Sequence, residues 1–291
     1  MISDAGKMKK RGILFRKLTD LIARGLAYAV LGLSVGAMFW ILADVFRYGC
    51  GELSLSFFLD PSKPFGVEDS GIANALLGTL LITSGAVAVA LPAGLLAGIY
   101  LAEFARETRM GAVIRFSGNV MMGIPSILAG LFIYAIWVVP QGSFSGLAGS
   151  LSLAVIMFPL VMRNTEEILG MVPDSLRESA LALGMSRMRA IVCIVCRSAR
   201  NGLMTGVLLS LARVAGETAP LLFTALWSDG WPKGYFTEPT SNLPVLITEY
   251  MTNSPFEEMH RIGWAAALVV TILILILNLL CRICFREKKN V

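Results

Sequence analysis

Charged side chains are scarce in this sequence. Asp, Glu, Lys and Arg make up 15% of its 291 residues, whereas hydrophobic residues make up 56%. Soluble domains carry about 25% charged residues, because polar groups must cover much of their surface. The scarcity of charge excludes an ordinary soluble globule and indicates a protein embedded in a lipid bilayer.

Groups that catalyse hydrolysis or bind nucleotides are missing as well. The chain has one histidine, His260, and no Gly-x-Ser-x-Gly segment, which excludes a Ser–His hydrolase. It has no Gly-x-x-x-x-Gly-Lys-Ser/Thr loop, so it lacks the usual phosphate cradle for ATP. Two Cys-x-x-Cys pairs, Cys193/Cys196 and Cys281/Cys284, lie far apart and lack knuckle glycines, so we expect no metal or other cofactor. We therefore predict that the chain is not an enzyme and that another polypeptide supplies any energy from ATP.

The hydrophobic residues gather in long runs. A helix crosses the hydrocarbon layer with about 20 apolar residues, because each buried N–H and C=O must be bonded within the segment. The runs cover residues 21–46, 73–102, 119–139, 147–168, 202–226 and 262–283. They predict an all-α polytopic membrane protein of six transmembrane helices, with an N-terminal segment (1–20), one transmembrane domain (21–283) and a tail (284–291). Pro92 and Pro125 lie inside two runs, where we expect kinks.

The basic residues predict the orientation of these helices. If both termini lie in the cytoplasm, the inner segments hold 20 of the 25 Lys and Arg residues and the outer loops hold four. Basic residues favour the cytoplasmic side of a membrane. We therefore predict a multi-pass membrane protein with both termini in the cytoplasm. This arrangement explains the net charge of +5 without a nucleic-acid partner.

Two shorter segments carry expectations of their own. Residues 103–109 include acidic and basic side chains that alternate in sign at helical spacing, which favours a solvated surface helix. Residues 243–250, in the last outer connection, favour a short interfacial helix, since Trp227 and Trp231 mark the membrane boundary nearby.

The longest inner connection, residues 169–200, has a helical pattern rather than the composition of a turn. Pro173 followed by Asp174 is typical of a helix start, since proline suits the first turn and an acid there complements the helix dipole. Its motif consists of Glu178, Ser179 and Ala180, then Gly184 after three residues, then Ile194 after nine more. The segment favours a docking element, although a plain surface helix between two spans fits the same residues.

Two charged residues lie inside the fifth run. Arg213 and Glu217 are four positions apart, so on one continuous helix they share a face. Ionisable groups at this depth are costly and usually face a water-filled path or each other. The pair therefore predicts either a hydrated route through the membrane or a salt bridge that locks the helix.

The motif between residues 178 and 194 resembles that of ABC importer permeases, which reads Glu-Ala-Ala, three residues, Gly, nine residues, Ile, any residue, Leu-Pro. Ser179 replaces the first alanine, and Cys196 and Arg197 replace the final Leu-Pro. In that family the loop forms a coupling helix that contacts the ATPase subunit. The resemblance implies this role for Glu178, Ser179, Ala180, Gly184 and Ile194.

Residues 212–225 resemble the phosphate-specific permeases of the PstA type. They read Ala-Arg, two residues, then Gly-Glu-Thr-Ala-Pro-Leu-Leu-Phe-Thr-Ala, and match each position of that family's fifth-helix motif. The resemblance implies a phosphate path lined by Arg213, Glu217 and Arg163. The planar fork of a guanidinium suits phosphate because it bonds two oxygens at once. Arg163 lies near the inner end of the fourth run, where a role as a cytoplasmic anchor is an equal alternative.

The resemblance also implies a location in the bacterial inner membrane, a fold and partners. We expect a type I ABC importer (MetI-like) transmembrane domain with five core helices and a peripheral first helix. The expected partners are a second homologous permease (PstC type), a dimer of ATPase subunits (PstB type), an extracytoplasmic phosphate-binding protein (PstS type) and membrane lipid. The main alternative is an importer for another oxyanion, such as molybdate or sulfate. A membrane enzyme would need a catalytic pair inside the bilayer, and a passive channel would not need the coupling segment.

Overall fold

The chain is helical, with no strand, over the residues that the structure describes, 2–67 and 70–284. This computed structural model confirms the predicted all-α class and divides into two units, residues 1–48 and 49–291. The predicted tail begins at the last of the described residues and otherwise lies outside them.

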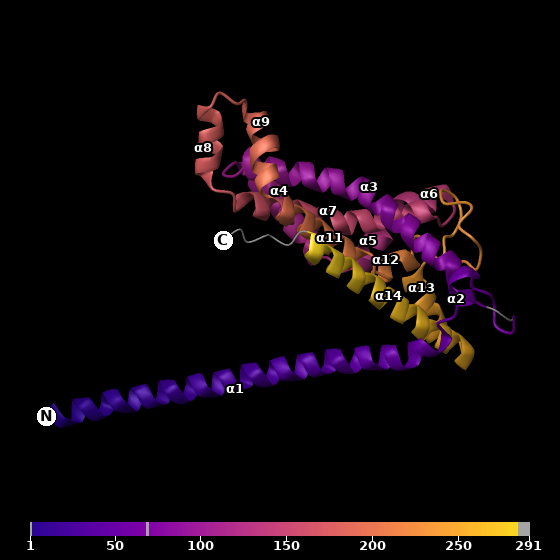
Figure 1. The fold of residues 1–291 in the computed structure, drawn as a ribbon, viewed down its shortest axis with the longest axis horizontal. Coiled ribbons are helices and arrows are strands. Elements are labelled where there is room, and N and C mark those ends of the chain that lie inside the picture. Colours follow the sequence, from indigo (N-terminus) through magenta and orange to yellow (C-terminus); the bar gives the residue numbers. More distant parts are fainter. Residues whose placement is uncertain (1, 68–69, 285–291) are drawn as a thin grey trace. The chain divides into compact units, whose positions relative to one another are not determined.

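The first unit is one helix, α1 (Ile2–Gly49), drawn in indigo in Figure 1. Its part from residue 19 onward is long and apolar enough to cross a membrane, in agreement with the first predicted span. The helix also runs through the N-terminal segment, so the predicted boundary at residue 20 is not a helix boundary.

The second unit contains three more unbroken spans, α3 (Ala73–Glu103), α7 (Gly146–Gly170) and α14 (Glu257–Cys284). Pro92 lies inside α3 without ending it. Two further helix pairs are sharply bent: α4 (Arg109–Gly123) against the segment that begins with α5 (Ser126–Ile133), by 101°, and Arg187–Ser198 against α11 (Arg200–Val214), by 72°. The described residues thus form four unbroken spans, or six if each bent pair counts as one, which is the predicted number.

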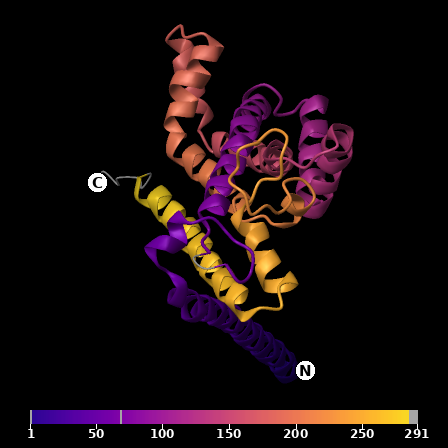
Figure 2. The same ribbon diagram turned by 90° about the vertical axis from the view of Figure 1, so that its right-hand side faces the viewer.

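Shorter elements connect these spans (Figures 1 and 2). They are η1 (Cys50–Glu52), α2 (Leu55–Leu59), the π-helical turn η2 (Tyr134–Val138), α6 (Val139–Gln141), α8 (Asp174–Ala182), α9 (Arg187–Ala190), the π-helical turn η3 (Ile191–Val195), α10 (Cys196–Ser198), α12 (Ala219–Leu222), α13 (Leu243–Thr248) and the π-helical turn η4 (Glu249–Asn253). In both views α8 and α9 project from one end of the second unit.

Proline explains the first bend. A proline disfavours the helical region for the preceding residue, and Ile124 has the extended values φ −76° and ψ 134°. The kink expected at Pro125 is therefore a complete break between two helices.

The fifth predicted span ends earlier than expected. α11 stops at Val214, and α12 is a single turn that starts at Ala219. Pro220 lies in the first turn of α12, where its missing N–H costs nothing, whereas a helix continuing from α11 would need that donor. The prediction of one helix over residues 202–226 is therefore wrong beyond Val214.

The core of the second unit lies between α3 and α7, which pack along each other. A Cβ atom at Gly94 would lie 2.8 Å from Val161 Cβ, and one at Gly98 would lie 2.5 Å from Thr165 Cβ. Small residues let helix backbones approach closely inside a membrane, where packing holds helices together. α3 and α7 therefore form a tightly packed pair.

The short helix expected between the last two spans forms as α13. Leu243 and Leu246 of α13 are 1% and 0% exposed, and they pack in a cluster with Ala265 and Ala266 of α14. The Asn242 side chain caps the start of α13 by accepting a hydrogen bond from the Val245 amide at 3.1 Å. This apolar helix therefore packs against α14 inside the protein, and its position at the membrane interface stays a prediction.

Candidate functional site

A cavity of about 630 Å³ lies among the broken helices of the second unit. The end of α4, the start of α5, the middle of α7 and the end of α11 line it. Most of the lining is apolar, and Arg213 and Glu217 are the charged residues among the described side chains that line it. Its volume falls within the range of about 300–1,000 Å³ that is usual for ligand pockets.

Two interruptions of the helices border this cavity: the break between α4 and α5, and the non-helical residues between α11 and α12. Pro125 and Ser126, at the start of α5, line one side, and Glu217, between α11 and α12, lines another. Non-helical backbone is tolerated at membrane depth only where protein buries it or where it lines a water-filled space. A helix start also carries partial positive charge from its unpaired N–H groups. The site thus joins a guanidinium and a positive helix end in one apolar cavity.

Arg213 and Glu217 both line the cavity, but they do not lie on one helix as predicted. Arg213 lies in the last turn of α11 and Glu217 lies beyond the end of that helix, so the two do not share a helix face. Over the described part of the chain, neither side chain forms a hydrogen bond or ion pair, so the predicted alternative of a locking salt bridge is absent in this conformation. Arg213 is exposed and Glu217 is half-buried.

Arg163 lies on α7 and is already paired with acidic neighbours. Its Nη1 lies 3.1 Å from Glu166 Oε2, and its Nε lies 2.9 Å from Glu167 Oε1. Arg115 of α4 contacts the same Glu166 carboxylate. Arg163 is not among the residues that line the cavity, so the structure does not bring it together with Arg213 and Glu217.

The predicted coupling motif falls on α8 and the segment after it. α8 follows Pro173, as expected, and contains Glu178, Ser179 and Ala180. Gly184 ends this helix with a φ of +81°, a left-handed conformation that only glycine adopts at little cost. Ile194 lies in the π-helical turn that leads towards α11.

The surface of the coupling segment carries apolar side chains. Leu183 is 85% exposed, and Leu176 and Leu181 of α8 are 40% and 48% exposed. Exposed apolar groups on a projecting helix are therefore a feature of this segment.

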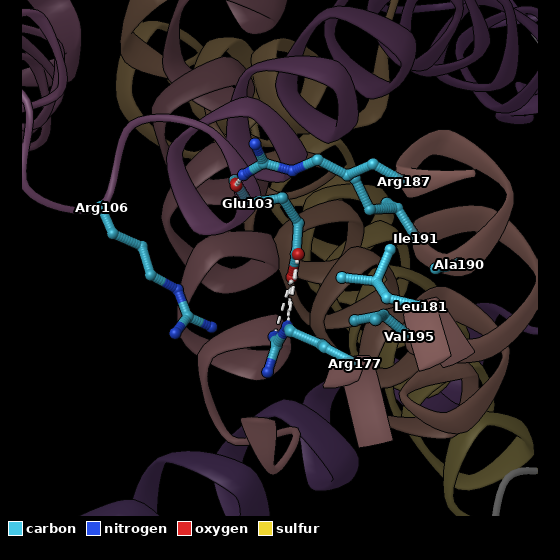
Figure 3. A pocket seen from close by; sticks show the side chains of 8 residues that line it. All are labelled: Glu103, Arg106, Arg177, Leu181, Arg187, Ala190, Ile191 and Val195. Atoms are coloured by element: carbon cyan, nitrogen blue, oxygen red, sulfur yellow. Dashed lines mark hydrogen bonds and ion pairs between the residues drawn. The ribbon is translucent and has the colours of Figure 1, made fainter. Parts of the chain in front are cut away.

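One residue near this segment, Glu103, has a role that its place in the sequence does not indicate. Glu103 was expected on a solvated surface helix, but α3 ends there and its side chain is buried, where it pairs with Arg177 of α8. Figure 3 shows the two side chains at a pocket of about 340 Å³ between the end of α3 and the α8–α9 segment. No local pattern reveals this pair, because 74 positions separate its members.

The structure describes the side chains of only one of the two Cys-x-x-Cys pairs. Cys193 and Cys196 are free thiols on the segment after α9. The side chains of the second pair, at positions 281 and 284, lie outside the described residues.

Comparison with known proteins identifies the family. Residues 94–288 match the family described as binding-protein-dependent transport system inner membrane component. The phosphate transport system permease protein PstA of Yersinia pestis is 40% identical over 100% of this chain and 98% of its own length. The protein of the same name from Haemophilus influenzae is 40% identical over 94% of this chain and 96% of its own length.

The fold is similar to that of a solved transporter. The inward-facing MetNI methionine ABC transporter matches with a TM-score of 0.58 and 18% identity, over 73% of this chain and 92% of that one. This likeness concerns the fold alone and agrees with the predicted MetI-like transmembrane domain. On the family match and the close relatives, the chain belongs to the binding-protein-dependent transport system inner membrane components, and within them to the PstA-type permeases.

Proposed function

We propose that this multi-pass inner-membrane protein is the permease subunit of an ATP-driven importer, and that it carries inorganic phosphate into the cytoplasm through the cavity at Arg213. One observation carries the proposal. The Arg213 guanidinium lines a cavity between broken membrane helices and has no ion-pair partner among the described residues. The names of the relatives in Yersinia pestis and Haemophilus influenzae support phosphate as the substrate.

The chemistry of the cavity suits a transported anion. Arg213 is charged at every physiological pH, and its fork matches two phosphate oxygens. The start of α5 adds partial positive charge on the same cavity. Apolar walls lower the local dielectric, so an anion that enters is attracted more strongly than it would be in bulk water.

The proposal includes an orientation and partners. The end that carries α8 faces the cytoplasm together with both termini, in line with the distribution of basic residues. The exposed leucines of α8 dock on an ATPase subunit of a PstB-type dimer. A PstC-type permease closes the path from the side, and a PstS-type phosphate-binding protein delivers phosphate from outside. The cavity opens outward when ATP is bound and inward after hydrolysis.

Arg163 does not line the cavity in this conformation, so its proposed contact with phosphate is conditional. Its two carboxylate neighbours satisfy its charge in this conformation, so it lines the path only in a conformation where Glu166 or Glu167 releases it. The alternative role as an anchor at the end of α7 needs no such release.

A competition assay tests the proposed substrate. The complex of this chain with its partner permease, ATPase subunits and binding protein is reconstituted in vesicles, and uptake of labelled phosphate is measured with ATP inside. We expect unlabelled phosphate in excess to suppress uptake, and sulfate or molybdate at the same concentration to leave it unchanged. Suppression by either of these anions, with their own ATP-dependent uptake, would favour the oxyanion alternative.

Replacing Glu217 with glutamine tests its role as a competitor for the Arg213 guanidinium. The carboxylate keeps the cavity from holding phosphate too tightly, because both anions compete for one positive charge. We expect Glu217→Gln to lower the phosphate concentration for half-maximal uptake and to slow maximal uptake, each by roughly threefold to tenfold. Glu107→Gln, at an exposed side chain away from the cavity, is the control. An unchanged concentration dependence in Glu217→Gln would show that this carboxylate plays no part in release.

A further inference from the structure

A buried ion pair joins α8 to the end of α3 (Figure 3). Arg177 Nη2 lies 2.8 Å from Glu103 Oε1, and Arg177 Nε lies 3.1 Å and 3.2 Å from the two carboxylate oxygens. The Glu103 side chain is 6% exposed and the Arg177 side chain 14%. A planar guanidinium that holds both oxygens of a carboxylate fixes the orientation of the two groups as well as their distance.

The other donors of Arg177 tie it to the end of α7. Its Nη2 donates to the carbonyl oxygen of Leu169 at 2.8 Å, and its Nη1 donates to that of Val172 at 2.5 Å and to Asp174 Oδ1 at 3.0 Å. One side chain thus connects α8, the end of α3 and the turn after α7. Loss of the Glu103 charge would remove the buried counter-ion of this guanidinium and leave only Asp174, whose side chain is 66% exposed, which is unfavourable.

Besides this pair, α8 packs against η3, and turns at both of its ends connect it to the rest of the chain. A short turn through Pro173 joins it to α7, and a turn through Gly184 follows it. The pair Arg106–Asp174 is largely exposed, at 42% and 66%, so water weakens it. Arg187 adds one hydrogen bond to the carbonyl oxygen of Glu103 from beyond the Gly184 turn. The Glu103–Arg177 pair is therefore the main rigid contact between α8 and α3.

The end of α3 is in turn coupled to the cavity. α3 packs tightly on α7 through Gly94 and Gly98, and α7 carries Val155, Ile156 and Leu160 in the wall of the cavity. A densely packed interface transmits strain, so a displacement of one of these helices is passed on to the other. A displacement of α8 that reaches α3 would therefore also move this wall.

We propose that the Glu103–Arg177 pair is a coupling clamp, which locks α8 to α3 so that movement of α8 by the ATPase displaces the α3–α7 wall of the cavity. Both are positioning residues and neither touches the transported anion. The inference rests on the proposed function, because only an importer driven by a separate ATPase needs such a clamp.

The test measures coupling rather than activity alone. Phosphate uptake and ATP hydrolysis are measured per assembled complex in vesicles, with the binding protein and phosphate present. We expect Glu103→Gln to lower the amount of phosphate transported per ATP about tenfold or more while hydrolysis continues. Movement of α8 would then no longer displace α3. Normalisation to assembled complex removes any loss caused by poorer folding.

Conservative and matched variants complete the experiment. Glu103→Asp keeps the carboxylate and should retain more transport per ATP than Glu103→Gln, whereas Glu107→Gln, at an exposed side chain on the same connection, should match the wild type. An unchanged ratio in Glu103→Gln, or uptake and hydrolysis that fall in parallel, would overturn the clamp alone. A wild-type complex that hydrolyses ATP without moving phosphate would overturn the proposed function and the clamp with it.

Discussion

Replacing Arg213 with glutamine is expected to reduce ATP-dependent phosphate uptake by about 100-fold or more. Glutamine keeps much of the side-chain volume but removes the positive charge on the cavity. Loss of a charge-assisted, two-pronged hydrogen bond costs roughly 3 kcal/mol, which corresponds to that factor. Uptake of labelled phosphate by the reconstituted complex measures the effect.

Two further variants separate charge from geometry at this position. Arg213→Lys keeps the charge but loses the planar fork, so we expect uptake between those of the wild type and Arg213→Gln. Arg261→Gln removes an equal charge from an exposed side chain, whose Nε lies 3.5 Å from Glu52, and should leave uptake within about twofold, because exposed ion pairs contribute little. Normal uptake by Arg213→Gln would remove the basis for an anion path at this cavity.

The membrane spans could be predicted from the sequence because each depends on local composition. A membrane helix needs a long apolar run that hydrogen-bonds its own backbone groups. The number of such runs and their approximate positions follow from the residues alone. The breaks are harder to predict. Pro92 and Pro125 look alike in the sequence, yet α3 continues through the first and the chain breaks at the second. A proline disfavours a helix at the preceding residue without excluding one, so the proline alone does not predict which helix breaks.

The site could be predicted in part for the same reason. Arg213 and Glu217 stand out because charge is rare inside an apolar run, and both line the cavity. The predicted geometry of the two residues is wrong, because it places both on one continuous helix, whereas α11 ends at Val214. The role of Glu103 could not be predicted, because it depends on an ion pair with Arg177. Only folding brings these two side chains within hydrogen-bonding distance.

Deleting residues 178–184 is expected to abolish ATP-dependent uptake while the chain still inserts into the membrane. The deletion removes the second half of α8 and the Gly184 turn, but it leaves Arg177 and the core between α3 and α7 in place. Loss of the exposed apolar surface around Leu181 and Leu183 removes the proposed contact with the ATPase subunit. We therefore expect the ATPase subunit to stop co-purifying with this chain, whereas the partner permease still does. Passive phosphate flux that survives the deletion and needs no ATP would instead identify a channel, because a channel has no use for a helix that transmits force.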